Sequence, residues 1–209
     1  MPKSEPFERH TDRYEDWFDT HQSAYRSEVE ALERLLPQPG FGLEIGVGSA
    51  RFAAPLGMQV GLDPAAEMLA RARDRGVDVV RGVAESLPFG DGTFDTALMV
   101  TTICFVDDIA RTLAEARRVL RPDGALVVGY IDRDSPVGRV YQEKQSENPF
   151  YRDAVFVSTD ELVEAMKAAG FSAFEFVQTI YHWPGEIDDP EPIDSGYGEG
   201  SFVGIRATR

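Results

Sequence analysis

The fold is decided by one stretch of sequence, Phe41-Gly42-Leu43-Glu44-Ile45-Gly46-Val47-Gly48-Ser49-Ala50-Arg51-Phe52. Its alternating apolar residues predict a short buried strand. Gly46 and Gly48 then allow a tight turn with no Cβ in the way, and residues 51–56 are predicted to form the next helix. A glycine-rich turn between strand and helix lets a ligand lie against bare backbone, and the helix N-terminus offers unpaired N–H groups. This stretch therefore predicts a ligand-binding turn.

Two classes of cofactor are bound by such a turn. The dinucleotide fingerprint is G-x-G-x-x-G, in which the last glycine allows close packing of helix on strand. Arg51 stands where that glycine is required, so an NAD-dependent oxidoreductase is disfavoured. The sequence instead fits acidic-x-Gly-x-Gly, with Glu44 two residues before the first glycine.

Length and charge limit the remaining possibilities. The chain has 209 residues, which predicts a single domain over 1–209 with a substantial core. Its net charge is −15, from 36 acidic and 21 basic residues. Such a field repels phosphate backbones and anionic membranes, so a nucleic-acid substrate is disfavoured.

Cysteine content and hydropathy indicate a cytoplasmic protein. Cys104 is the one cysteine, so an internal disulfide or a thiolate metal cage is excluded, and we predict no metal. Residues 1–6 lack the apolar core of a signal peptide. The longest apolar runs are too short to span a bilayer, so we expect no membrane insertion.

An aromatic stripe marks the N-terminal segment. Residues 7–36 predict one or two helices, which Pro37-Gln38-Pro39-Gly40 ends. The stripe follows spacings of three and four residues and consists of Tyr14, Trp17, Phe18, His21 and Tyr25. Two interpretations stay open: the stripe packs onto the main sheet, or segment 1–36 forms a lid in which Tyr14 closes over a ligand.

Strands and helices alternate along the rest of the chain. Strands are predicted at 58–64, 77–82, 94–100 and 125–131, and helices at 65–75 and 108–120. This alternation predicts an α/β fold, a three-layer Rossmann-like sandwich with helices on both faces of a mostly parallel sheet. A polar, loop-rich segment, 132–157, follows. A helix over 159–169 has its capping box at Ser158 and Glu161, and an acidic segment, 184–200, joins final strands at 171–181 and 201–208.

An acidic residue follows the second predicted strand. Asp63 lies 19 positions after Glu44, close to the spacing expected for a ribose-binding acid. A carboxylate there can accept strong hydrogen bonds from both ribose hydroxyls. The alternative is that Asp63 only caps the helix over 65–75.

Several motifs then occur in a fixed order. They are Glu44-x-Gly46-x-Gly48, Gly61-Leu62-Asp63-Pro64 with Met68-Leu69, Gly82-Val83-Ala84-Glu85-Ser86-Leu87-Pro88-Phe89, Phe94-Asp95-x-Ala97, and Glu115-Ala116-x-Arg118-Val119-Leu120-Arg121-Pro122-x-Gly124. This ordered set resembles the class I S-adenosylmethionine (SAM)-dependent methyltransferases, particularly the type 11 branch that is similar to ubiquinone and menaquinone biosynthesis methyltransferases. The resemblance covers residues 40–131 closely and the last helix and strands more loosely.

The resemblance implies a fold, a cofactor and a set of contacts. The sheet would have seven strands, the last one antiparallel. SAM would be the cofactor and S-adenosylhomocysteine (SAH) the product. The implied cofactor-binding residues are Tyr14, Glu44, Gly46, Gly48, Asp63, Pro64, Met68, Ala84, Glu85 and Thr101. Two positions depart from the family: Ala50 replaces a frequent third glycine, and Val83 replaces a frequent acid, which leaves adenine recognition to the Ala84 backbone and Glu85.

The acceptor side is less defined. Ligands of open α/β sheets bind beyond the carboxyl ends of the strands, which places 101–107, 132–157 and 184–200 at the site, the last two as substrate-side insertions. If the acceptor must lose a proton, the candidate bases are Asp132, His182 and Glu199, with His21 from the lid. Each has an ordinary alternative as a solvated or structural residue. Tyr197, in a glycine-rich run with Glu199, is a candidate for lining the acceptor pocket.

The sequence leads to a small-molecule methyltransferase, with the methylated atom (O, N, C or S) undefined. Two alternatives stay open: a SAM- or SAH-binding protein without methyl transfer, and a methyltransferase acting on a protein. We expect a monomer or a homodimer.

Overall fold

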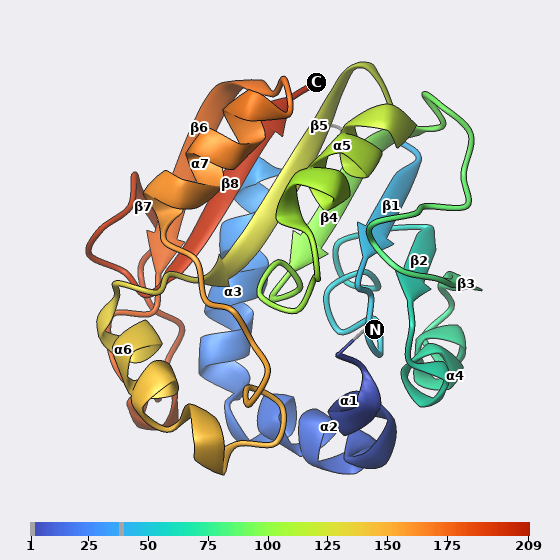
Figure 1. Cartoon of the computed structure of the whole chain (residues 1–209). Coiled ribbons are helices and arrows are strands. Elements are labelled where there is room, and N and C mark those ends of the chain that lie inside the picture. Colours follow the sequence, from blue (N-terminus) through green and yellow to red (C-terminus); the bar gives the residue numbers. More distant parts are fainter. Residues whose placement is uncertain (1–2, 38–39) are drawn as a thin grey trace.

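A computed structural model describes residues 3–37 and 40–209. Met1 and Pro2, at the start of the predicted lid, and Gln38 and Pro39, in the segment predicted to end the helices, lie outside the described residues. The elements follow one another along the chain (Figure 1) as α1 (Glu5–Arg9), α2 (Thr11–Thr20), α3 (Gln22–Leu35), β1 (Gly42–Ile45), β2 (Val60–Asp63), α4 (Ala66–Asp74), β3 (Asp78–Arg81), β4 (Phe94–Val100), α5 (Ile109–Val119), β5 (Leu120–Ile131), α6 (Pro136–Glu143), the 3₁₀ turn η1 (Gln145–Glu147), α7 (Thr159–Ala168), β6 (Ser172–Thr179), η2 (Pro184–Glu186), β7 (Asp194–Ser195) and β8 (Phe202–Thr208).

The described strands form one sheet in the order β3-β2-β1-β4-β5-β8-β6-β7. The first five strands of the chain pair in parallel, whereas β8 is antiparallel to both β5 and β6. The predicted α/β class and the antiparallel last strand are confirmed. The strand count differs from the expected seven, because the two-residue β7 within segment 184–200 pairs with the outer edge of β6.

The sheet is covered on both faces, as the alternation of β4 shows. Ala97 and Met99 belong to the core on the α5 and α7 side, and Leu98 and Val100 belong to the core on the α3 and α4 side. Successive side chains of a strand point to opposite faces, and a strand that is buried on both reads as a continuous apolar run. Figure 1 shows α5 and α7 in front of the sheet and α3 behind it.

Residues 51–56 differ from the prediction of a helix, because the structure has only turns there. The Ala54 N–H donates to Ala50 O over 3.2 Å and the Leu56 N–H donates to Phe52 O over 3.1 Å. Pro55, between them, has no N–H to continue the ladder. The segment after the glycine turn is therefore wound like a helix without becoming a regular one.

Two other segments contain more helix than predicted. The described part of the N-terminal segment forms three helices rather than one or two, because His10 (φ −124°) and His21 (φ −119°) leave the helical conformation. Segment 132–157, predicted as loop, contains α6, where Ser135 accepts the Gly138 N–H and a proline occupies the first turn. At α7 the predicted capping box of Ser158 and Glu161 is confirmed.

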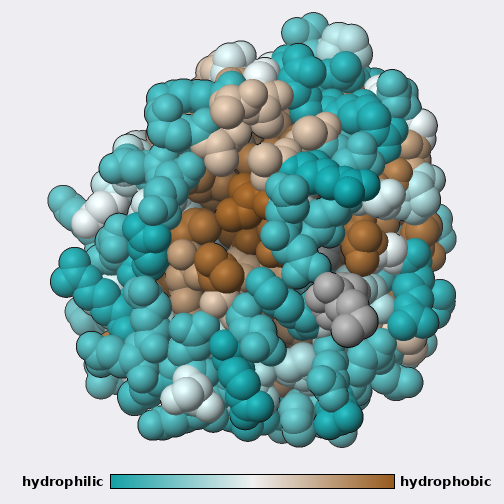
Figure 2. All heavy atoms as spheres, in the orientation of Figure 1, coloured by the Kyte–Doolittle hydropathy of each residue, from teal (hydrophilic) through white to brown (hydrophobic). Residues whose placement is uncertain are grey.

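The helices that surround the site lie beyond one end of the parallel strands. Figure 1 shows α1, α2 and α6 together beyond the carboxyl ends of the parallel strands. On the face in Figure 2, hydrophilic residues predominate and hydrophobic ones gather near the middle. No helix among the described residues is long and apolar enough to cross a membrane.

Candidate functional site

A cavity of about 540 Å³ lies at the carboxyl ends of β1, β2 and β4. The helices α1 and α2 and the segment that follows α6 form its other walls. Nine of the ten predicted cofactor residues line it: Tyr14, Gly46, Gly48, Asp63, Pro64, Met68, Ala84, Glu85 and Thr101. Residues from five different stretches of the chain thus meet at one place.

The end of this cavity formed by Gly46, Gly48 and Asp63, called the glycine-turn end below, is held together by one carboxylate. Asp63 Oδ2 accepts the Gly48 N–H over 2.9 Å, and its Oδ1 accepts the Ala65 N–H over 2.8 Å. Burial raises the pKa of Asp63 to about 6. The carboxylate therefore ties the end of β2 to the glycine turn while it faces the cavity.

The helix cap considered for Asp63 is supplied by a different residue. The first free N–H groups of α4, at Ala66 and Glu67, donate to the carboxylate of Glu8 over 2.6 and 3.1 Å. Glu8 belongs to α1, 58 positions earlier in the chain. The N-terminal helices are thereby fastened to the α/β sheet at the end of α4.

A second acidic residue fastens α2. Glu15 accepts hydrogen bonds from Arg51 (2.9 Å) and Arg75 (2.5 Å), and its side chain is only 8% exposed. Arg75 also donates to Ser49 O in the glycine turn over 2.6 Å. This network fixes α2 against the turn, so Tyr14, one residue before Glu15, is held over it.

Tyr14 covers the turn directly. A Cβ at Gly48 would lie 3.4 Å from the Tyr14 hydroxyl. Burial raises the pKa of Tyr14, and the nearby carboxyls of Glu44 and Asp63 raise it further. The phenol therefore stays protonated and faces the cavity as a hydrogen-bond donor.

The backbone around the turn adopts left-handed conformations, which strain Thr101 but not Gly46. Gly46 has φ +76°, and a Cβ there would lie 2.2 Å from the Thr102 hydroxyl. Thr101, on the facing strand end, has φ +48° although it is not glycine. Its N–H donates to Gly129 O over 2.7 Å. Such outliers persist where surrounding structure enforces them and gather at functional sites.

Two of the acidic residues predicted to contact the cofactor have other partners. Glu85 lines the cavity, and its Oε1 accepts the Asp107 N–H over 2.6 Å. Glu44 does not line the cavity, since it is 1% exposed behind the turn. Burial raises the pKa of Glu44 well above its usual range, against the effect of a hydrogen bond from the Ala53 backbone.

The three candidate bases lie outside the cavity. Asp132 accepts the Thr159 N–H (2.8 Å) and joins the end of β5 to the start of α7. His182 is exposed and pairs with Glu191. Glu199 is exposed and does not line the cavity, and its backbone N–H donates to Gln178 Oε1 over 2.9 Å. His21, the fourth candidate, does line the cavity.

Tyr197 does not line the cavity either. Its hydroxyl donates to Asp160 over 3.0 Å and its ring lies 5.0 Å from Phe176. Within segment 184–200, only Pro184 reaches the cavity, together with the preceding Trp183.

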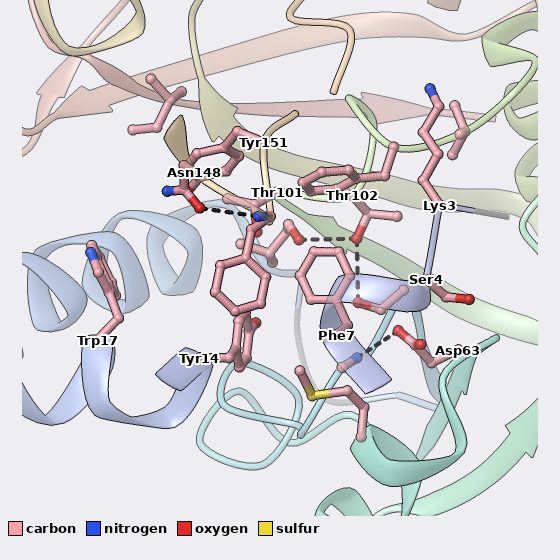
Figure 3. A pocket seen from close by; sticks show the side chains of 18 of the residues that line it. Lys3, Ser4, Phe7, Tyr14, Trp17, Asp63, Thr101, Thr102, Asn148 and Tyr151 are labelled. Carbon is pink, nitrogen blue, oxygen red and sulfur yellow. Dashed lines mark hydrogen bonds between the residues drawn. The ribbon is translucent and has the colours of Figure 1, made fainter. Parts of the chain in front are cut away.

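The other end of the cavity is aromatic, and Tyr151 and Trp183 within it were not predicted. Figure 3 shows Trp17 and Asp63 at opposite ends, with Tyr14 and Phe7 between them. Trp17 stacks on His21 (4.8 Å), and Tyr141 contacts both Tyr151 (4.9 Å) and Trp183 (5.9 Å). We call this the aromatic end, and define it by Trp17, His21, Tyr141, Tyr151 and Trp183.

A buried carboxyl lies among these rings. Glu28 of α3 lines the cavity, is 5% exposed, and has its pKa raised to about 8 by burial. It follows His21 by two helical turns, so both lie on one face of the helix. An acidic residue within the otherwise apolar stripe of Ala24, Ala31 and Leu32 was the signal that could have identified it from sequence.

Comparison with known proteins identifies the family. Residues 43–128 match the type 11 family described as "Methyltransferase domain". An uncharacterized protein of Methanocaldococcus jannaschii is 41% identical over 203 residues, which span 97% of this chain and 98% of that protein. A demethylmenaquinone methyltransferase of Corynebacterium kroppenstedtii is 36% identical over 101 residues, which span 46% of this chain and 44% of that protein.

A solved structure agrees over nearly the whole chain. It is a SAM-dependent methyltransferase from Thermotoga maritima, described as a "possible histamine N-methyltransferase". It shares 50% sequence identity and a TM-score of 0.96, covering 98% of this chain and 99% of that chain. The chain therefore belongs to the class I SAM-dependent methyltransferases of type 11, enzymes whose cofactor is S-adenosylmethionine.

Proposed function

We propose that this methyltransferase acts on a small molecule that binds at the aromatic end of the cavity, while SAM occupies the glycine-turn end. The observation that carries the proposal is that both ends belong to one cavity of about 540 Å³. The walls from α1, α2 and the segment after α6 limit what can reach its interior. A ligand-sized, largely apolar cavity with few polar groups is typical of small-molecule sites.

The residues at the glycine-turn end fit the cofactor. Gly46 and Gly48 leave a cradle that a Cβ would fill, since at Gly48 it would approach the Tyr14 hydroxyl to 3.4 Å. Each oxygen of Asp63 accepts one backbone N–H and keeps a further lone pair. Those lone pairs would accept the ribose hydroxyls, and Ala84 and Glu85 would contact the adenine.

SAM, when bound, supplies a methyl group activated on a sulfonium. The contribution of this chain is to align the acceptor and to exclude water. Tyr14, which lies between the two ends, and Trp17, at the aromatic end, would do both. Where the acceptor must lose a proton, His21 and Glu28 are candidate bases at the aromatic end.

The relative from Thermotoga maritima supports a small acceptor, because its description names histamine as a possible substrate. The net charge of −15 argues against nucleic acid as acceptor.

Isothermal titration with SAM and SAH tests the cofactor assignment. Asp63→Ala removes two acceptor sites for charge-assisted hydrogen bonds, each worth about 1.5–3 kcal/mol, so we expect affinity to fall about tenfold or more. Asp78→Ala, on the exposed edge strand β3, is the matched control and should bind as the wild type does. Unchanged affinity in Asp63→Ala would refute the assignment.

The acceptor class is tested with SAM labelled on its methyl group. The enzyme is incubated with a cell extract, which is then separated into low-molecular-weight and protein fractions. Label in the low-molecular-weight fraction supports the proposal. Label confined to protein, or SAM binding without any transfer, contradicts it.

A further inference from the structure

The carboxyl of Glu28 is buried at the aromatic end without a partner. It is 5% exposed and lines the cavity. Among the described residues, no hydrogen bond or ion pair reaches its side chain. Burying a charge without compensation is unfavourable, so a sequence that keeps an acid here provides a site for a ligand group that supplies the missing donor.

The surroundings of Glu28 favour one kind of ligand. Tyr141, Tyr151 and Trp183 present aromatic rings to the same end of the cavity. Ring faces carry negative potential and attract cations. A carboxyl and several rings around one space therefore attract a positive group and repel a negative one.

The charged groups near Glu28 among the described residues form no ion pair with its carboxyl. Lys144 is exposed, and its Nζ lies 5.7 Å from the centroid of the Trp183 ring without an ion pair to Glu28. The titratable and charged groups that face or line this part of the cavity, taken over α2, α3, α6 and the segment after α6, are Arg13, Tyr14, His21, Tyr25, Tyr141, Lys144, Glu147 and Tyr151.

We propose that Glu28 is the acceptor-recognition residue and that the acceptor is a small aromatic amine, whose nitrogen donates to the Glu28 carboxylate while its ring lies among Tyr141, Tyr151 and Trp183. This inference rests on the proposed function, since it names the substrate class of that same cavity. It concerns recognition of the amine and holds whichever atom of the acceptor is methylated.

Recognition by a carboxyl of raised pKa has a measurable signature. Free Glu28, with a pKa of about 8, holds its proton at pH 7. An ammonium that binds there needs the carboxylate, so binding expels that proton. The expected release is about 0.9 proton per amine bound at pH 7.

The experiment uses wild type, Glu28→Gln and Glu30→Gln, each saturated with SAH. Glu30 lies on α3 two residues away, exposed and paired only with Arg26, and is the matched control. The probes are 2-phenylethylamine, 2-phenylethanol and phenylacetate, which share a ring and differ in the polar group. Titrations at pH 7 in two buffers of different ionisation enthalpy give the affinity and the number of protons released.

For the wild type we expect the amine to bind at least about tenfold more tightly than the alcohol, with phenylacetate weakest. Glu28→Gln should lose this preference and the proton release, with SAH affinity unchanged. Glu30→Gln should behave as wild type.

Three results overturn the proposal: a wild type without preference for the amine, a preference or proton release that survives in Glu28→Gln, or a loss of SAH affinity in Glu28→Gln, which would place Glu28 with the cofactor. Failure of the proposed function looks different, because wild type would then bind no SAH or would methylate only protein.

Discussion

Replacing Glu28 by glutamine should change how stability depends on pH. Burial raises the pKa of Glu28 from its ordinary 4.5 to about 8 in the folded protein. Each pKa unit corresponds to about 1.4 kcal/mol, so ionising Glu28 in the fold costs up to about 5 kcal/mol. This is a large part of the 5–15 kcal/mol by which a domain of this kind is usually stable.

The sign follows from proton binding. Between pH 4.5 and about 8 the folded state holds a proton at Glu28 that the unfolded chain has lost. The stabilisation is therefore fully present below 4.5 and is lost as pH rises through about 8. From about pH 5 to about pH 9 the loss amounts to about 4 kcal/mol. Glutamine has nearly the shape of the protonated acid and does not titrate, so the variant avoids this loss.

Urea unfolding followed by tryptophan fluorescence at about pH 5, 7 and 9 measures the effect. The free energy of unfolding of Glu28→Gln minus that of wild type should rise by about 4 kcal/mol across this range. Other titrating groups, Asp63 among them, are present in both proteins and cancel in the difference. Glu30→Gln should show a constant difference. If Glu28→Gln also gives a difference constant within about 1 kcal/mol, the carboxyl is not buried as described.

Three further predictions concern the contacts that hold the site. Glu8→Ala removes the acceptor at the start of α4 and should lower the free energy of unfolding by about 1 kcal/mol, measured by urea denaturation. Glu15→Gln removes the carboxylate that two partly buried arginines share, leaves Arg75 without an anion and Arg51 with Asp19 alone among the described residues, and should cost about 3 kcal/mol in the same assay, whereas an exposed ion pair would cost under about 1. Gly46→Ala places a Cβ 2.2 Å from a threonine hydroxyl and should abolish SAH binding in titration calorimetry; Gly57→Ala, which has similar φ but open space, should retain it at a cost of about 1–2 kcal/mol in stability.

The parts of the fold that were predictable carry local signals. The strand β4 is an apolar run, and α7 begins with a capping box, so a few consecutive residues are enough to predict each element. The glycine-turn end was predictable for the same reason, since its residues follow strands whose order the alternating pattern fixes. In contrast, the prediction of a helix at residues 51–56 was wrong because Pro55 has no N–H to continue the hydrogen-bond ladder.

The full aromatic end and the contacts that hold α1 and α2 were not predictable because they depend on contacts between distant residues. Glu8 meets the first turn of α4 from 58 positions away, and nothing in its own neighbourhood marks it as a cap. Glu28 carries a local signal, an acid within an apolar stripe, but only the folded cavity shows which rings surround it. Chain order placed Glu199 and His182 at the site, although Glu199 follows the edge strand β7 and the His182 side chain pairs with Glu191.

The two carboxylates that attach α1 and α2 to the rest of the protein differ in their exposure to water. Glu8, at the end near Asp63, is 28% exposed, so water and salt compete for its bonds. Glu15, which holds α2 against the glycine turn, is 8% exposed and is shielded from that competition. We therefore expect rising salt concentration to loosen α1 from α4 before it loosens α2 from the turn, so that Tyr14 remains over Gly48.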